Sequence, residues 1–356
     1  MSMCFKKVGF LASTIVSTAI STVSLFAAFE LNHQAKAIVV SGDPNDYIVE
    51  PGTGYDGVVR LLQREGSERG GCTAALLSSG KHILTAAHCL DNRLAPGLIS
   101  SANVLFDLPF GTTSIKAKNF FVHPDWDGFD NFDSLDGDLA ILELTSMAPE
   151  AAERYDIYRN TDEIGQVNTK VGYGLSGQGN QGLDRENFPY GVKRLGQNLY
   201  DSVGEILSTV VPANFIPGAF LAYDFDNGKP ENDAFGTLGL PDLGLGLQEV
   251  TPASGDSGSP IFINGLIAGI TSGGTCVGFD FVNFNCSSPP DVDNVVNASF
   301  GEFGFDTRVS TYASYIDDVL AGNIAPTKTI PEPNTIFSAI LALGAFAVHS
   351  RSKKAQ

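Results

Sequence analysis

Short β-type runs, separated by clusters of Gly, Asn, Asp and Pro, recur along the middle of this chain. They are Val58–Leu62, Ala74–Leu77, His82–Ala86, Val104–Phe106, Leu139–Leu144, Ile261–Ile263 and Leu266–Thr271. Runs of this length between turn signals predict the strands of a sandwich or of barrels. Helical spacing of apolar residues is clearest at Ser310–Leu320, and residues 175–250 have the composition of long surface loops. No fixed period repeats, which argues against a solenoid.

The N-terminal segment has the three parts of a secretory signal peptide. Lys6 and Lys7 precede an uncharged apolar run from Val8 to about Phe29, and an Ala-Lys-Ala site ends at Ala37. This order predicts export and cleavage after Ala37. An uncleaved anchor is the alternative, because about 20 apolar residues can span a bilayer. The many Ser and Thr residues in the run favour cleavage.

The C-terminus carries a second targeting pattern. Ile330–Pro333 reads Ile-Pro-Glu-Pro, residues 336–348 carry no charge, and Arg351, Lys353 and Lys354 follow. As a helix this apolar run would be about 20 Å long, which is short against a hydrocarbon core of about 30 Å. The pattern resembles the PEP-CTERM sorting signal of bacterial exported proteins, which implies processing at the inner membrane. A marginal membrane tail is the alternative.

Charge argues against a nucleic-acid partner. The chain has 22 Lys and Arg against 40 Asp and Glu, a net charge of −18. Removing residues 1–37 and 334–356 takes away six basic and one acidic residue, which leaves −23. Nucleic-acid binders instead cluster Lys and Arg against phosphates.

Four cysteines lie between the two targeting segments, and an even number in an exported chain suggests two disulfides. They are Cys72, Cys89, Cys276 and Cys286.

Three separated segments carry the residue types of nucleophilic catalysis. Leu84–Cys89 reads Leu-Thr-Ala-Ala-His-Cys, Asp138–Leu142 reads Asp-Leu-Ala-Ile-Leu, and Gly255–Pro260 reads Gly-Asp-Ser-Gly-Ser-Pro. Together they resemble the signatures of the trypsin/chymotrypsin-like serine proteases, in that family's order of His, Asp and Ser. The resemblance extends over about residues 55–320. An α/β-hydrolase elbow is excluded, because it needs Gly where this chain has Ser259.

The resemblance implies an all-β fold of two antiparallel six-stranded β-barrels with a short C-terminal helix. The expected organisation is a signal peptide at 1–37, a protease domain at 38–325 and a sorting segment at 326–356. Within the domain, barrel one would span about 55–145 and barrel two about 165–309, and the helix would follow at about 310–320.

The family's chemistry assigns a role to each residue of the three segments. His88 would take the proton from Ser257, whose hydroxyl is a poor nucleophile at neutral pH. Asp138 would hold the imidazole tautomer and stabilise the imidazolium. The N–H groups of Gly255 and Ser257 would form the oxyanion hole, in which each donor is typically worth about 3–4 kcal/mol.

Other residues could compete for two of these roles. Asp136 is an alternative acid, but Asp138 is preferred because it directly precedes the family's Leu/Ile-Ala step. His82 and His123 are alternative bases by composition only. His82 lies outside the signature, and His123 begins a His-Pro pair that the family often carries before its acid.

The resemblance also implies disulfide pairings. It pairs Cys72 with Cys89, which would brace the loop of His88; two free buried thiols are the alternative, which export disfavours. The family often bridges the region just before Gly255 to the region near Cys276, but residue 253 is Ala here. A local Cys276–Cys286 bond is therefore the expected second pair.

An activation mechanism follows from the same resemblance. In the family a newly cut N-terminus pairs with the acid that precedes the nucleophile, which is Asp256 here. Cleavage after Ala37 would expose Ile38. Our hypothesis is that signal peptidase itself creates the activating terminus, with a later cut, or a chance Ile-Val sequence, as the alternatives.

The substrate pocket can be aligned in part. Ser272 and Gly274 match the strand that pairs with substrate backbone, and Gly304 matches a glycine that keeps the primary pocket open. Thr251 stands where trypsins carry an acid, so that position does not support a preference for Arg or Lys. Asp306 lies near the expected floor and could restore such a preference, with a solvated or hydrogen-bonded acid as the alternative. The alignment favours uncharged side chains.

No cofactor is expected, and no zinc motif is present. A run of aspartates invites a calcium interpretation, but its spacing is not that of an EF-hand. An exposed acidic loop is therefore preferred. The run consists of Asp125, Asp127, Asp130, Asp133 and Asp136.

The leading hypothesis is an exported serine endopeptidase that acts through an acyl-enzyme at the cell surface, in the extracellular matrix or as a secreted enzyme. It would be a monomer acting on proteins or peptides, with membrane contact only through its terminal segments. A non-catalytic binding protein of the same fold and a matrix structural protein are the alternatives. The complete set of catalytic residue types counts against the first of them.

Overall fold

The computed structural model describes residues 38–65, 68–91, 97–128, 136–210, 215–280, 283 and 285–331. The predicted signal peptide and most of the predicted sorting segment lie outside the described residues. Within the part of the chain that is described, no helix is long and apolar enough to cross a membrane.

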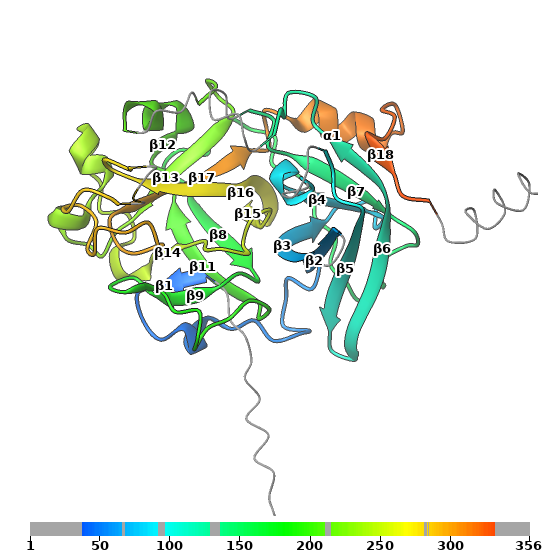
Figure 1. Cartoon of the computed structure of the whole chain (residues 1–356), viewed down its shortest axis with the longest axis horizontal. Coiled ribbons are helices and arrows are strands. Elements are labelled where there is room, and N and C mark those ends of the chain that lie inside the picture. The colour runs from blue at the N-terminus through cyan, green and yellow to red at the C-terminus, as the bar shows by residue number, and fades with distance from the viewer. Residues whose placement is uncertain are drawn as a thin grey trace, which may run out of the picture. The chain divides into compact units, whose positions relative to one another are not determined.

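The first barrel is closed (Figure 1). Its strands lie in the order β6-β5-β2-β3-β4-β7, and pairing of β6 with β7 completes the ring. A short strand, β18, adds to β6 outside the ring through pairs such as Lys328 with Phe120. The strands are β2 (Val58–Glu65), β3 (Glu68–Leu76), β4 (His82–Thr85), β5 (Ser101–Leu108), β6 (Gly111–Val122), β7 (Ala140–Leu144) and β18 (Lys328–Thr329).

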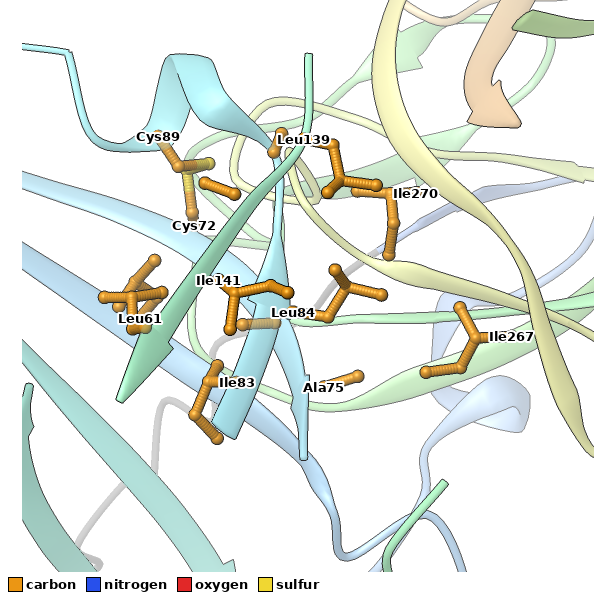
Figure 2. Close-up of a cluster of buried hydrophobic side chains, with 14 of the residues drawn as sticks. Leu61, Cys72, Ala75, Ile83, Leu84, Cys89, Leu139, Ile141, Ile267 and Ile270 are labelled. Atoms are coloured by element: carbon orange, nitrogen blue, oxygen red, sulfur yellow. A yellow bond between two sulfur atoms is a disulfide. The ribbon is translucent and has the colours of Figure 1, made fainter. Parts of the chain in front are cut away.

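Alternation of apolar and polar residues explains the interior of this barrel. Along β5 every second side chain is buried, and these inward positions are Ala102, Val104, Phe106 and Leu108. A period of two is that of a strand with one face on a core. The core continues from this barrel to Ile267 and Ile270 of the second sheet, as Figure 2 shows. Shared packing therefore fixes the two sheets against each other.

The second sheet contains seven strands in the order β11-β8-β15-β16-β17-β13-β12. Its edge strands β11 and β12 are separated along the chain by only Tyr200 and Asp201. Because three Cα steps span at most about 11 Å, the sheet must curl until its edges approach. The strands are β8 (Val167–Gly172), β11 (Arg194–Leu199), β12 (Ser202–Val203), β13 (Phe220–Phe225), β15 (Pro260–Ile263), β16 (Leu266–Cys276) and β17 (Glu302–Arg308).

A small third sheet holds the beginning of the described chain. Its order is β10-β9-β1-β14, in which β1 pairs parallel with β9 and antiparallel with β14. These strands are β1 (Ile38–Val40), β9 (Ser176–Gln178), β10 (Gly182–Leu183) and β14 (Val250–Thr251).

Helices are few and short. The α-helix α1 (Ala313–Leu320) buries Ile316 and Val319, and the ring of Tyr312 just before it packs on that of His123. This spacing of buried residues is the one that predicted the helix. The 3₁₀ helices are η1 (Pro44–Tyr47), η2 (Ala87–Cys89), η3 (Gly204–Thr209), η4 (Pro230–Asn232), η5 (Phe235–Leu238) and η6 (Gly246–Gln248).

The predicted all-β architecture with a short C-terminal helix is confirmed, with one difference in detail. The first barrel has the expected six strands in a closed ring, whereas the second is a seven-stranded half-barrel. The second sheet does not close into a ring because its edge strand β12 has only two residues. Among the described strands, these residues pair with β13 alone.

Candidate active site

The structure brings His88 and Asp138 together from different parts of the first barrel. His88 lies on η2 directly after β4, and Asp138 lies just before β7, the strand that pairs with β4. The Nδ1 of His88 is 2.8 Å from Asp138 Oδ2, and the backbone N–H of His88 donates to Asp138 Oδ1 at 2.9 Å. Two bonds to one carboxylate fix both the position and the orientation of the imidazole ring.

The environment of Asp138 keeps its carboxylate ionised. Burial by itself would raise its pKa, but the charge of His88 and hydrogen bonds from His88 and Ser272 outweigh burial and lower it. Ser272 contributes through its hydroxyl, which donates to Asp138 Oδ2. The side chain of Ser272, aligned above with a substrate-binding strand, therefore also orients the acid. A carboxylate in this state can stabilise a protonated imidazole next to it.

Ser257 lies beside the turn that carries His88. Its carbonyl oxygen accepts a hydrogen bond from Thr73 N at 2.9 Å and lies 3.5 Å from Cys89 Sγ. The next residue, Gly258, has a φ of +79°, and a Cβ there would come within 2.0 Å of Thr85 Oγ1. Only glycine at this position lets the serine loop, residues 255–260, approach the turn that carries His88 this closely.

Gly255 gives the serine loop its second tight turn. Its φ is +98°, and a Cβ at this position would lie 2.7 Å from the ring of Tyr190. Among the described residues, neither Gly255 N–H nor Ser257 N–H donates to a protein acceptor. These two donors remain available to a ligand, as an oxyanion hole requires.

Thr73 is a positioning residue that sequence reasoning missed. Its backbone N–H binds the carbonyl of Ser257, and its hydroxyl donates to the carbonyl of Gly255 at 3.1 Å. The hydroxyl of Tyr190, whose ring lies against Gly255, donates a further hydrogen bond to the Cys72 carbonyl at 2.9 Å. The only sequence signal for Thr73 is its place next to Cys72.

The alternative acid and bases are engaged elsewhere. Asp136 accepts hydrogen bonds from Tyr312 and from Gly137 N. His82 Nδ1 lies 2.9 Å from Ser79 Oγ, and the ring of His123 packs edge-to-face against the rings of Tyr312 and Tyr315. Burial lowers the pKa of both histidines. In the described structure it is Asp138, and not Asp136, that contacts His88.

Two disulfides are present. One joins Cys72 on β3 to Cys89 on η2, directly beside His88 (Figure 2). The other joins Cys276 at the end of β16 to Cys286. Because Cys72 and Cys89 are bonded to each other, neither offers a thiolate to a metal next to His88.

A pocket of 210 Å³ opens beside Ser257. Its walls include Thr251, Ser272, Gly274 and Gly304, which the alignment assigned to substrate binding. The ring of Tyr223 packs beneath Gly304, where a Cβ would come within 2.2 Å of it.

Asp306, the fifth aligned pocket residue, lies outside this pocket and behind Tyr223. Asp306 is fully buried, and its Oδ2 is 3.0 Å from Lys170 Nζ and 2.8 Å from Tyr200 Oη. The lysine sits 3.4 Å from the centre of the Tyr223 ring. An acid that is neutralised by a buried lysine does not present its charge to a substrate.

The pocket instead contains an acid that the alignment did not single out. Glu302 lines the wall, and its Oε1 accepts hydrogen bonds from Asn297 N and Ser299 N, both at 2.8 Å. Burial raises the pKa of Glu302 to about 8, although these hydrogen bonds oppose the shift. At pH 7 this side chain is mostly protonated and uncharged.

Ile38 and Asp256 meet beneath the serine loop. The backbone nitrogen of Ile38 is 3.3 Å from Asp256 Oδ2, which also accepts from Ala253 N, while Oδ1 accepts from Gly174 N. Asp256 is fully buried, and burial raises its pKa to about 7. Ile38 has a φ of +64°, a left-handed conformation that is strained for a β-branched residue.

The acidic run on the β6–β7 connection shows no assembled metal site in the described part. Asp130 and Asp133 lie outside the described residues, and Asp136 is bound by Tyr312. No cluster of three ligand atoms forms around Asp125 or Asp127 among the described residues.

Comparison with known proteins agrees with this architecture. Residues 54–201 match the family model for trypsin. Among solved structures, the chain is similar to neuropsin, a serine protease expressed in the limbic system of mouse brain, with 17% sequence identity and a TM-score of 0.52. That match covers 75% of this chain and 95% of neuropsin. The chain therefore has the fold of the trypsin-like serine proteases, and its residues 54–201 match their family.

Proposed function

We propose that this protein is a serine endopeptidase that uses Ser257, His88 and Asp138. The observation that carries the proposal is the buried His88–Asp138 pair, held beside a serine that borders an open pocket. The same loop leaves the two N–H groups of Gly255 and Ser257 without a protein acceptor among the described residues. A nucleophile, a base with its orienting acid, and oxyanion donors are the parts that acyl transfer needs.

In the proposed reaction, Ser257 Oγ attacks the carbonyl carbon of the peptide bond while His88 Nε2 takes its proton. The negative charge moves to the carbonyl oxygen, where Gly255 N–H and Ser257 N–H bind it. His88 then protonates the leaving amine as the C–N bond breaks. A water molecule, deprotonated by His88, hydrolyses the acyl-enzyme and restores Ser257.

A peptide-library cleavage profile tests this function, and the same measurement shows which side chains the pocket accepts. We expect hydrolysis at internal peptide bonds, with an uncharged residue preferred on the acyl side at neutral pH. The preference follows from Thr251, Gly274 and Gly304 in the walls and from the protonated Glu302. Cleavage only at chain ends, or no cleavage by folded protein, would contradict the proposal.

Glu302 predicts a pH-dependent specificity. As pH rises through about 8, its carboxyl ionises, and the pocket gains a negative charge that attracts Lys and Arg side chains. The ratio of kcat/KM for a Lys substrate to that for a Leu substrate should rise about tenfold between pH 6.5 and 9. Glu302→Gln should show a flat ratio, and a ratio that rises equally in this variant would disprove the role of Glu302.

We propose further that Ile38 becomes the N-terminus of the active enzyme and pairs with Asp256. Cutting the bond before Ile38 removes the preceding carbonyl, so the strain of its positive φ is relieved. It also turns the neutral N–H at Asp256 into a charged ammonium, which would stabilise the buried carboxylate.

This activation predicts a strict requirement at the N-terminus. One extra residue before Ile38 should lower kcat/KM by about 10²–10⁴, because losing one partner of a buried ion pair costs about 3–5 kcal/mol. Ile38→Val should retain activity. The charged ammonium is the form that pairs with Asp256, so activity should fall when alkaline pH deprotonates the amine. Active protein that begins at any other residue would refute the hypothesis.

Export is part of the proposal and is supported by the two disulfides, which persist in oxidising compartments. We propose a signal peptide at residues 1–37, a monomeric peptidase domain at 38–325, and a PEP-CTERM-like segment at 326–356. Mass spectrometry of the protein secreted by its own host would give both ends of the mature chain. Retention of residues 1–37 would contradict this organisation.

A further inference from the structure

The connection between β13 and β14 begins and ends on buried carboxylates. Asp224 is the fifth residue of β13, Asp226 directly follows that strand, and Glu249 directly precedes β14. All three are at most 2% exposed. One carboxylate oxygen from each lies within 4.8 Å of those from the other two. Three like charges this close in a buried place repel one another unless protons or a cation compensate them.

One oxygen of this cluster has no partner. Asp226 Oδ1 accepts a hydrogen bond from Gly228 N at 2.7 Å, but its Oδ2 is buried without a donor among the described residues. Buried polar atoms nearly always have a partner, so an unpaired carboxylate oxygen inside a carboxylate cluster points to a missing ligand.

The other two carboxylates are held in place by backbone N–H groups. Asp224 Oδ2 accepts from Ala234 N at 2.7 Å and from Phe235 N at 3.0 Å. Glu249 Oε2 accepts from Asp226 N at 3.0 Å, so one member of the cluster orients another. The oxygens are therefore preorganised by their own connection.

The surroundings supply more negative charge and little positive charge. Asp201 Oδ2 accepts from Asp224 N at 3.2 Å, and the carboxylates of Asp201, Asp233 and Asp242 raise the pKa of members of the cluster, in addition to burial. Lys170, on β8 of the same sheet as β13, is already paired with Asp306 at 3.0 Å.

We propose that Asp224, Asp226 and Glu249 bind one Ca²⁺ ion. All the ligand atoms are carboxylate oxygens, which hard divalent cations prefer. Ca²⁺ lies about 2.4 Å from its ligands, so oxygens on opposite sides of it are about 4.8 Å apart, the limit within which these three fall. Water or backbone carbonyls complete its shell of six to eight oxygens.

The ion would join the two ends of the β13–β14 connection. The far end continues into Thr251, which pairs with Val39 of β1 and lines the pocket beside Ser257. Bound Ca²⁺ therefore stabilises the pocket wall and the strand that holds Ile38. This effect on the pocket rests on the proposed peptidase function, whereas binding of the ion does not.

The test measures Ca²⁺ binding by calorimetry and Tm in excess Ca²⁺ or EDTA, neither of which depends on peptidase activity. Wild-type protein should bind one ion at this site and should melt at a higher temperature in Ca²⁺ than in EDTA. Asp226→Asn and Glu249→Gln should each weaken binding by about 100-fold or more. In EDTA Asp226→Asn should melt at or above the wild-type temperature, because a repelling carboxylate has been removed and Asp226 Oδ2 accepts no hydrogen bond among the described residues.

The matched control is the double variant Asp125→Asn/Asp127→Asn, which alters the exposed aspartates that the sequence alone would nominate. It should keep the wild-type affinity and the wild-type shift in Tm. The proposal fails if wild-type protein binds no Ca²⁺ and melts identically in Ca²⁺ and EDTA, in which case protons alone compensate the cluster. It also fails if Asp226→Asn retains binding, or if the control loses it.

Discussion

Replacing Ser257 with alanine is expected to lower kcat for peptide hydrolysis by about a million-fold. The variant removes the one oxygen that can form the acyl-enzyme, while Gly255 N–H and the backbone N–H of residue 257 remain. These donors can still bind a carbonyl oxygen, so the residual rate should exceed that in water. Steady-state kinetics on the best library peptide measure the loss, and KM should change little because the pocket walls are intact.

Ser259→Ala is the matched control for this prediction. Ser259 belongs to the same loop, but it is buried, and its hydroxyl has no hydrogen-bond partner among the described residues. Its removal should leave both stability and kcat close to wild type. Loss of activity in Ser259→Ala but not in Ser257→Ala would show that the nucleophile has been assigned to the wrong residue.

Asp138→Asn is expected to lower kcat by about 10⁴-fold with little change in fold. The asparagine has the shape of the aspartate and can keep one acceptor on the backbone N–H of His88. Its NH₂ group cannot accept a proton from His88 Nδ1, which would favour the tautomer that presents N–H to Ser257. A base that already carries its proton on Nε2 cannot take one from the serine.

Asp136→Asn separates the two candidate acids. Asp136 accepts hydrogen bonds from Gly137 N and Tyr312, and its substitution should change kcat by less than about threefold. Circular dichroism and Tm would show that both variants are folded. If the asparagine at 136 were as damaging as the one at 138, the assignment of the acid would be wrong.

The strands with compact apolar runs were predictable, and those with mixed composition were not. Every predicted run in the first barrel corresponds to a strand, but β6 was missed because its first four residues are exposed and polar. The strands β11 and β13 lie in a segment rich in Gly, Asn and Asp that predicts loops. Asn198 of β11 is an example: its buried side chain donates to two backbone carbonyls. Tertiary contacts of this kind stabilise a strand where the composition alone predicts a loop.

The candidate site was predictable wherever a motif fixed the residue. His88, Asp138 and Ser257 stand in signatures; the structure pairs His88 with Asp138, and Ser257 lines the pocket. Thr73 and Glu302 stand in no signature, because their roles arise from hydrogen bonds and burial that only the folded chain creates. The position of Asp306 in the sequence left its role open, because the sequence did not reveal its buried partner Lys170.

Covalent labelling with a fluorophosphonate tests the central claim most directly, because the reagent reacts with a serine that an adjacent base has activated. Peptide mapping by mass spectrometry should place one adduct on Ser257, Ser257→Ala should remain unlabelled, and unlabelled wild-type protein should cleave casein. A folded wild-type protein, with Ile38 as its N-terminus, that neither takes up the label nor cleaves casein would contradict the account.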